Sequence, residues 1–185
     1  TVVTQPANKT VCTDKVATFS VTAAGTEPFS YQWQVSSDIG NTYTNISNAG
    51  VYSGATSATL TITAPPVTMS GYLYRAIITG AAPCAADTSN AVRLTVNPLP
   101  VVVIAADPTR LVPGMTTTIT STVTPNAVAT GGYVWTRNGA QVGGSTPTLP
   151  VDIDGLGDYQ LTVTDVNGCT ASSNVVTIAD SASGK

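Results

Sequence analysis

The stretch Phe29-Ser-Tyr-Gln-Trp-Gln-Val-Ser36 decides the fold of this chain. Aromatic and apolar residues alternate with polar ones along it, which predicts a strand with one buried face. A weaker copy occurs later, at Tyr133-Val-Trp-Thr-Arg137. Each copy carries one central tryptophan, with an alternating Thr-rich strand before it and a tyrosine-containing strand after it. The sequence therefore predicts the same arrangement of strands in both halves of the chain.

The flanking sequence extends both copies into complete sets of strands. Proline and glycine turns separate the segments, and no window of helical length shows a helical period. In the first half we predict strands at 1–12 (interrupted by Pro6), 16–23, 29–36, 43–46, 57–63, 72–79 and 90–96. In the second half we predict strands at 101–105, 116–124, 132–136, 146–151, 157–164 and 169–178.

This pattern predicts an all-β fold of two tandem immunoglobulin-like β-sandwich domains, at residues 1–97 and 98–185. The prolines of Asn97-Pro-Leu-Pro100 predict a semi-rigid joint between them. In antibody-type domains two core cysteines form a disulfide beside the tryptophan. Here the two cysteine positions are occupied by Val21 and Ala76. We therefore expect each core to be held by apolar packing alone, with Trp33 and Trp135 inside. Tyr74 and Tyr159 occupy the tyrosine-corner position of this fold, where the hydroxyl bonds to the backbone, and Asn138-Gly139 predicts a tight hairpin.

Composition narrows the function classes. The chain of 185 residues has 9% charged residues, a net charge of -3 and no histidine. The lack of histidine removes the usual general base and the commonest transition-metal ligand. Seven scattered Lys and Arg residues form no basic stripe, which disfavours nucleic acid and anionic membrane surfaces. The absence of a long apolar run argues against membrane insertion, and we predict that the chain is not an enzyme.

Three cysteines, Cys12, Cys84 and Cys169, are the disulfide candidates. In an immunoglobulin topology the first turn and the last hairpin lie at opposite ends of a domain, whereas bonded cysteines must approach to about 6 Å between α-carbons. An end-to-end tandem would bring Cys169 toward Cys12, so we favour that pairing, with Cys84 linking to a preceding module or subunit. A Cys12–Cys84 bond and free thiols remain alternatives, and either bond indicates an oxidising, extracytoplasmic setting.

Two further groups are candidate ligand sites. Tyr43 and Tyr52 lie in polar loop sequence and are possible contacts for a surface glycan or protein. The carboxylates of Asp152, Asp154 and Asp158 have a spacing that a calcium loop can use, although the remainder of an EF-hand loop is missing. The alternative is an ordinary acidic turn, and no other cofactor is predicted.

The first half of the chain, from Gln5-Pro6 through Tyr31-Gln-Trp-Gln34 to Arg93-Leu-Thr-Val96, resembles the Ig-like modules of Bacteroidota surface proteins. The segment Thr162-Val-Thr-Asp-Val-Asn-Gly-Cys-Thr-Ala171 is similar to the last hairpin of PKD-like repeats in large gliding-type adhesins. The resemblance implies export and a position in a long surface adhesin or beside enzyme domains.

We therefore predict a non-catalytic structural or adhesive module of an extracellular, cell-surface protein or filament. It would act as a stiff spacer and protein-contact surface, with neighbouring Ig-like modules or subunits as partners. The alternative is a carbohydrate-binding accessory pair of a secreted polysaccharide-degrading protein, in which Tyr43 and Tyr52 would converge on one exposed face.

Overall fold

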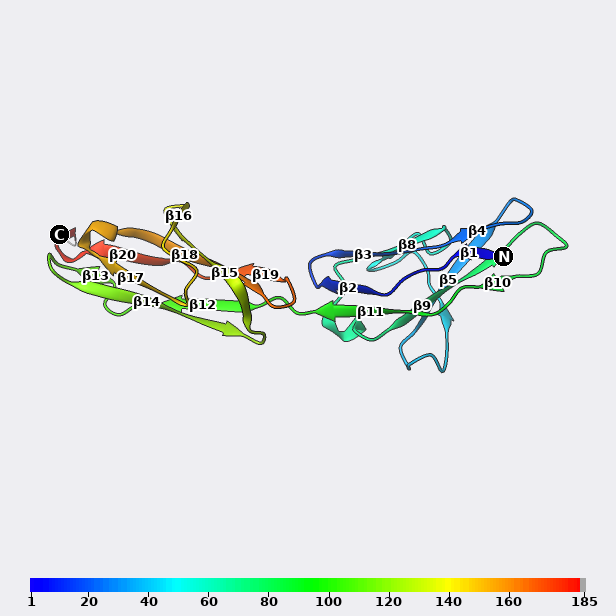
Figure 1. Cartoon of the computed structure of the whole chain (residues 1–185), viewed down its shortest axis with the longest axis horizontal. Helices are drawn as coiled ribbons and strands as arrows, with labels where there is room; N and C mark the ends of the chain where they lie inside the picture. The colour runs from blue at the N-terminus through cyan, green and yellow to red at the C-terminus, as the bar shows by residue number, and fades with distance from the viewer. Residues whose placement is uncertain (184–185) are drawn as a thin grey trace. The chain divides into compact units, whose positions relative to one another are not determined.

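The chain folds into strands joined by turns and short 3-10 segments, as predicted, in a computed structural model that describes residues 1–183 (Figure 1). It divides into two compact units, Thr1–Pro98 and Leu99–Lys185, one residue beyond the boundary expected from the sequence. Within the described residues no helix is long and apolar enough to cross a membrane. Each unit is a mainly antiparallel sandwich with one parallel strand pair and a hydrophobic core of its own.

The first domain is built from two main sheets. The larger has the strand order β2-β11-β9-β5-β6 with β10 paired to β9, and the smaller has the order β3-β8-β7. β1 and β4 form a separate ladder, and β2 runs parallel to β11. This order is that of an immunoglobulin-like sandwich. The strands are β1 (Val2–Thr4), β2 (Lys9–Cys12), β3 (Val16–Ser20), β4 (Thr22–Ala23), β5 (Ser30–Ser36), β6 (Thr44–Asn45), β7 (Tyr52–Ser53), β8 (Thr59–Thr63), β9 (Leu73–Thr79), β10 (Asp87–Thr88) and β11 (Val92–Asn97).

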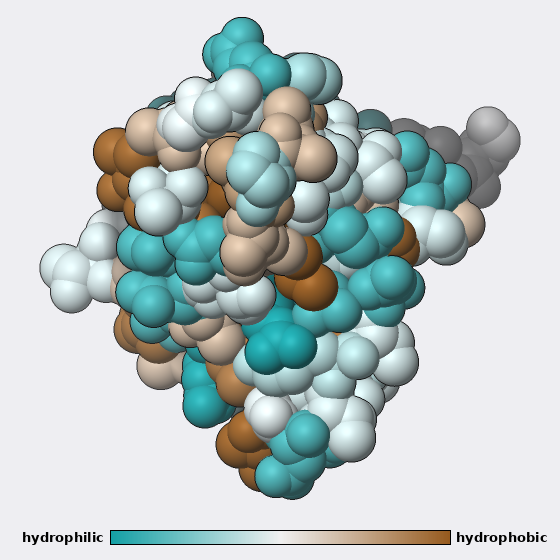
Figure 2. Space-filling model, turned by 90° about the vertical axis from the view of Figure 1, so that its right-hand side faces the viewer, coloured by the Kyte–Doolittle hydropathy of each residue, from teal (hydrophilic) through white to brown (hydrophobic). Residues whose placement is uncertain are grey.

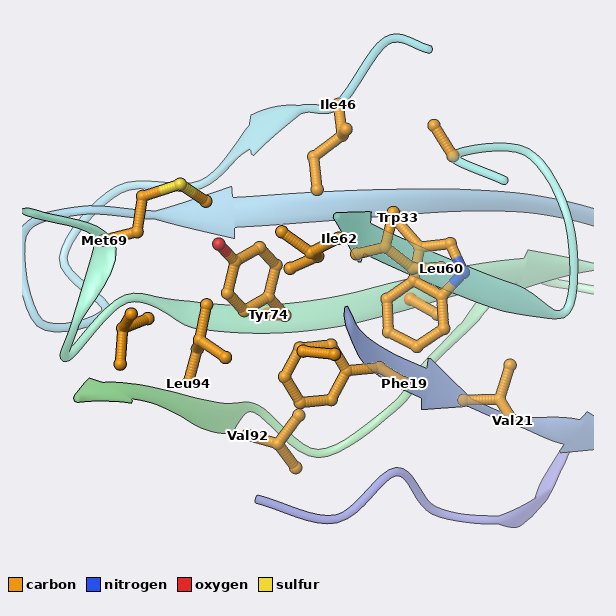
Figure 3. Packing of buried hydrophobic residues seen from close by; sticks show 14 of the residues in the cluster. Phe19, Val21, Trp33, Ile46, Leu60, Ile62, Met69, Tyr74, Val92 and Leu94 are labelled. Carbon is orange, nitrogen blue, oxygen red and sulfur yellow. The ribbon is translucent and has the colours of Figure 1, made fainter. Parts of the chain in front are cut away.

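The core of the first domain forms around Trp33, whose side chain is fully buried, as predicted (Figure 3). Its indole N–H donates to the Ser57 carbonyl at 2.9 Å, so the buried ring leaves no polar atom unpaired. Phe19 from β3 stacks on Tyr74 from β9, with ring centroids 5.1 Å apart. Aliphatic side chains of β8 and β11 fill the space between the two sheets. The core contains no disulfide, because Val21 and Ala76 occupy the cysteine positions of antibody-type domains.

The second domain repeats this plan. One sheet has the order β13-β20-β18-β15-β16 with β19 paired to β18, and the other has the order β12-β14-β17. Trp135 is buried and its indole N–H donates to the Thr146 carbonyl at 2.8 Å. The strands are β12 (Val101–Ala105), β13 (Arg110–Leu111), β14 (Thr116–Thr124), β15 (Val128–Arg137), β16 (Ala140–Val142), β17 (Thr148–Asp152), β18 (Gly157–Asp165), β19 (Thr170–Ser172) and β20 (Val176–Asp180). The predicted Asn-Gly hairpin joins β15 to β16, with positive φ at Asn138 and Gly139.

Each domain has a buried serine at the equivalent position, and its hydroxyl bonds two backbone groups in the last hairpin. Ser89 Oγ accepts the Ala76 N–H at 2.9 Å and donates to the Asn90 carbonyl. In the second domain Ser173 Oγ accepts the Leu161 N–H at 3.0 Å and donates to the carbonyl of the following asparagine. The sequence signal is a repeated Ser-Asn pair, at 89–90 and 173–174, and sequence reasoning passed over it.

Two local features differ from the sequence-based expectation. The predicted strand 16–23 divides near Val21, whose N–H donates to the Ala58 carbonyl, so that β3 pairs with β8 while β4 pairs with β1. Tyr74 occupies the tyrosine-corner position, but its hydroxyl bonds to the Tyr52 hydroxyl at 3.1 Å and not to the backbone. Tyr159 does form the corner expected of it, because its hydroxyl donates to the Gly155 carbonyl.

We expect Ser89→Ala to lower the free energy of unfolding of the first domain by about 1–3 kcal/mol, because the Ala76 N–H would lose its acceptor inside the core. Hydrogen-exchange mass spectrometry along a urea series measures each domain through its own peptides. Ser20→Ala is the matched control, since Ser20 bonds Thr59 on the exposed face. Equal effects of the two substitutions would contradict the role assigned to Ser89.

Candidate functional site

The cysteines are the most informative of the predicted site residues. Cys12 and Cys169 are disulfide-bonded, whereas Cys84 is a free and exposed thiol. The alternative Cys12–Cys84 pairing is therefore wrong, and the favoured Cys12–Cys169 pairing agrees with the bonding states. The physical reason lies within the first domain. Cys12 pairs with Asn97 at the end of β2, whereas Cys84 lies in the β9–β10 loop at the opposite end of the sandwich (Figure 1).

Cys169 is presented by a tightly bonded turn at the end of β18. The carboxylate of Asp165, itself 1% exposed, accepts the backbone N–H groups of Asn167 and Cys169 at 2.9 and 2.8 Å. Its other oxygen accepts the side-chain amide of Asn126 at 2.8 Å. Burial opposes ionisation of Asp165, but these hydrogen bonds outweigh it and lower the pKa of the carboxyl group. The turn is therefore fixed by a buried anion.

Sequence analysis did not single out Asp165. Asp-x-Asn-Gly reads as an ordinary turn, and only the structure shows that the carboxylate reaches both the cysteine backbone and the loop before β15. An aspartate four residues before a cysteine is the available sequence signal, since that spacing lets one carboxylate bond several N–H groups of one turn. It is too common a pattern to be decisive alone.

Tyr43 lies in the loop directly before β6, beside the larger sheet of the first domain, and its ring centroid is 3.7 Å from the guanidinium of Arg75. Arg75 in turn donates to the side chain of Gln34 at 2.9 Å. The loop before Tyr43 is closed by Asp38, which accepts the hydroxyls of Ser36 and Thr42 at 2.6 Å each. Tyr43 is half-buried, and its ring already contacts a cation.

Tyr52 lies on β7 of the smaller sheet, whereas Tyr43 lies in the loop before β6 of the larger sheet. Its ring meets Tyr74 edge-on, with centroids 6.3 Å apart, and packs against the core cluster. Burial is the main cause that raises the pKa of both phenols, which keeps the pair neutral. Of the two tyrosines predicted as ligand contacts, one therefore belongs to the smaller sheet and the other to a loop beside the larger sheet, and glycan binding through them stays a prediction.

Two of the three predicted calcium ligands, Asp152 and Asp158, accept hydrogen bonds through their carboxylates. Asp152 accepts the Asp154 N–H at 3.1 Å and caps a 3-10 turn, Ile153–Gly155. Asp158 accepts the hydroxyl of Thr177 on β20 at 2.6 Å. Within residues 1–183 no group of three or more Cys, Asp or Glu side chains is arranged to hold a metal ion. The carboxylates of Asp152 and Asp158 serve the turn and the neighbouring strand, and calcium binding by this group stays a prediction.

Strand order, buried tryptophans and the two independent cores define a protein of the immunoglobulin-like class, with two sandwiches in tandem. Residues 1–98 match the family model described as Domain of unknown function (DUF8696). That match spans more than half of the chain, and the chain belongs to this family. A search of curated proteins found no match.

Solved structures of immunoglobulin domain arrays are similar to the chain. The N-terminal four Ig domains of Dscam1 isoform 4.44 share 19% identity, with 96% of this chain and 45% of that chain covered and a TM-score of 0.48. For isoform 6.9 the identity is 18%, the coverages are 94% and 43%, and the TM-score is 0.46. The N-terminal eight Ig domains of Down Syndrome Cell Adhesion Molecule isoform 1.30.30 share 18% identity, with 94% of this chain and 22% of that chain covered and a TM-score of 0.44. The chain thus spans less than half the length of these structures.

We expect Asp165→Ala to destabilise the second domain by about 1–3 kcal/mol, because the buried N–H of Cys169 and the part-buried N–H of Asn167 would lose their acceptor. The disulfide of Cys169 should also be reduced faster by dithiothreitol, so that the fraction of Cys169 alkylated after brief reduction rises. Urea unfolding and alkylation after brief reduction measure the two effects, and Asp107→Ala, at an exposed aspartate, is the control. An Asp165 variant with unchanged stability and labelling would contradict this assignment.

The hydroxyls of Ser36 and Thr42 hold the pKa of Asp38 at about 2 in the folded chain. The ordinary value of an unfolded aspartate is about 3.9. Because the folded value is the lower one, the contribution of this carboxylate to stability is complete above about pH 4 and is lost as the pH falls toward about 2. Carboxyl NMR titration measures the midpoint directly. Thr42→Val, which removes one hydroxyl donor, should raise the midpoint; an unshifted midpoint would contradict this cause.

Proposed function

We propose that the chain is a non-catalytic spacer and contact module of an extracellular surface protein, whose two domains are locked together by a Cys12–Cys169 bond. The observation that carries the proposal is the bonding state of the cysteines: one bonded cysteine comes from each domain, and the third is free. A bond between them closes a loop that includes the whole of the first domain after Cys12 and most of the second. Such a crosslink restricts the unfolded chain and the joint alike.

The chemistry of the surface agrees with this role. Exposed threonines alternate with buried residues along β14, and charged residues make up 9% of the chain. On the face shown in Figure 2, hydrophobic residues are scattered among hydrophilic ones and form no single large patch. A weakly charged, polar surface suits a module that spaces other parts of a long protein. Placement in a Bacteroidota adhesin rests on the sequence resemblance, and an oxidising compartment is the setting in which a disulfide persists.

The proposed lock is tested first by non-reducing peptide mapping. We expect a Cys12–Cys169 peptide pair, with Cys84 recovered as the alkylated free thiol. The mechanical consequence is tested by ¹⁵N relaxation, which gives the rotational correlation time of each domain. Two locked domains share one correlation time, whereas the double variant Cys12→Ser/Cys169→Ser should give two shorter values. Cys84→Ser is the matched control and should behave as the wild type.

Two results would overturn the proposal. The first is a peptide map in which Cys12 or Cys169 is joined to Cys84. The second is a wild-type protein whose domains tumble separately, or a double variant that tumbles like the wild type. The folding of the double variant is checked by the dispersion of its amide spectrum, so that a loss of structure is not mistaken for a freed joint.

A further inference from the structure

The two domains can be compared position by position, because they share the same bonds around their tryptophans. Trp33 faces Ala76 across β5 and β9, and Trp135 faces Leu161 across β15 and β18. Tyr74 and Tyr159 each precede these partners by two residues. β8 pairs with β3 as β17 pairs with β14, so Ile62 corresponds to Val151.

In the first domain the free edge of β8 is covered by β7. Tyr52 stands opposite Ile62, and the Thr63 N–H donates to the Val51 carbonyl at 2.9 Å. The Tyr52 ring lies against Tyr74, and the two hydroxyls are 3.1 Å apart. One extended segment with a single tyrosine therefore completes this side of the sandwich.

The second domain has no such segment among its described residues. β17 is the last strand of its sheet, and β16 the last strand of the other. Only residues 143–147 join them, whereas residues 46–58 join β6 to β8 and contain β7. The uncovered edge leaves a cleft of about 590 Å³, within the size range of ligand pockets.

The cleft has an apolar floor and a polar end. Val142, Leu149 and Val151 line it together with Tyr159, whose side chain is 2% exposed. The Tyr159 hydroxyl donates to the Gly155 carbonyl, so its oxygen can still accept a hydrogen bond. That leaves Tyr159 able to bond an incoming hydroxyl in the way Tyr74 bonds Tyr52.

One cation lines the cleft. Arg137 on β15 is paired with Tyr159 on β18. At the corresponding place in the first domain, Val35 is paired with Tyr74. Its guanidinium donates to the Asp154 carbonyl at 3.3 Å, and the only ion pair among the described residues is Lys15–Asp14, in the other domain. Asp152 also lines the cleft, with one carboxylate oxygen on the Asp154 N–H. Arg137 can therefore donate hydrogen bonds to a carboxylate of a ligand, and Asp152 and the Tyr159 oxygen can accept one from a hydroxyl.

The edge itself discourages simple strand addition. Pro150 stands where the first domain has Thr61, and it has no N–H to give to an added strand. Proline on an edge strand is a common protection against strand pairing. Binding at this edge must therefore depend on a side chain that enters the cleft.

We propose that this cleft, lined by β15, β16, β17 and Tyr159, binds a tyrosine side chain of a partner protein, presented on an extended segment that carries an acidic residue beside it. The tyrosine ring occupies the space that Tyr52 fills in the first domain, its hydroxyl meets Tyr159, and the acidic group pairs with Arg137. The proposal concerns the second domain alone and does not depend on how the cysteines are joined.

The probe is a synthetic peptide with the sequence of residues 48–57, which contains Tyr52, titrated to millimolar concentration into the ¹⁵N-labelled chain. We expect amide shifts at residues 137, 142–144, 149 and 151–159. A peptide with Gly50→Asp should bind more tightly, by about two- to fivefold as one exposed ion pair allows. A peptide with Tyr52→Ala should lose at least about tenfold in affinity, because it lacks the aromatic anchor.

Two protein variants separate the contributions. Arg137→Gln should remove the advantage of the acidic peptide without weakening the neutral one. Gly144→Phe places a ring on the cleft wall at a glycine whose added Cβ would meet no atom within 4 Å, and it should block both peptides. Gly144→Ala is its matched control and should bind as the wild type. Amide spectra confirm the fold of each variant.

Several outcomes would overturn the proposal. These are an absence of shifts at the cleft, equal affinity for the Tyr52→Ala peptide, or undiminished binding by Gly144→Phe. Concentration-dependent shifts of the same residues in the protein alone would make a second copy the occupant. Shifts produced by oligosaccharides and not by the peptide would make the cleft a glycan site.

Discussion

Each sandwich depends on one buried tryptophan that joins its two sheets. The indole lies between the layers, and its N–H is satisfied by a carbonyl of the segment before the facing strand, at Ser57 or Thr146. Burying a ring of this size gives the largest single apolar contribution available to a domain of about this length. Because no core disulfide assists it, the surrounding aliphatic residues must pack closely enough to hold the sheets together.

Hydrogen bonds to buried backbone groups add specificity to this packing. Ser89 and Ser173 close the last hairpin of each domain, and Asp165 fixes the turn that carries Cys169. These side chains belong to loops and strand ends, where the regular ladders stop and leave donors without partners. Two serines and one aspartate thus accept backbone N–H groups that the ladders leave unpaired. The aspartate also fixes the backbone position of Cys169.

The sequence alone was sufficient for the fold class, for most strands and for both tryptophans, because alternation and buried aromatics are local signals. It was insufficient where partners are remote in sequence. Asp165 bonding Asn126, and Tyr52 meeting Tyr74, depend on the tertiary fold. The spacing of the aspartates at 152, 154 and 158 is a local signal, but the bond between the Asp158 carboxylate and Thr177 on β20 depends on the fold. The cleft beside β17 was equally invisible, because it arises from a segment that one domain has and the other lacks.

The absence of a disulfide inside either core has a consequence for biogenesis. Each domain can complete its hydrophobic packing with every thiol still reduced, since neither Val21 nor Ala76 awaits oxidation. Oxidation of Cys12 and Cys169 is then a finishing step on domains that are already folded. A failure of the oxidising machinery would leave two intact sandwiches joined only by the segment Asn97-Pro-Leu-Pro100, instead of an unfolded chain.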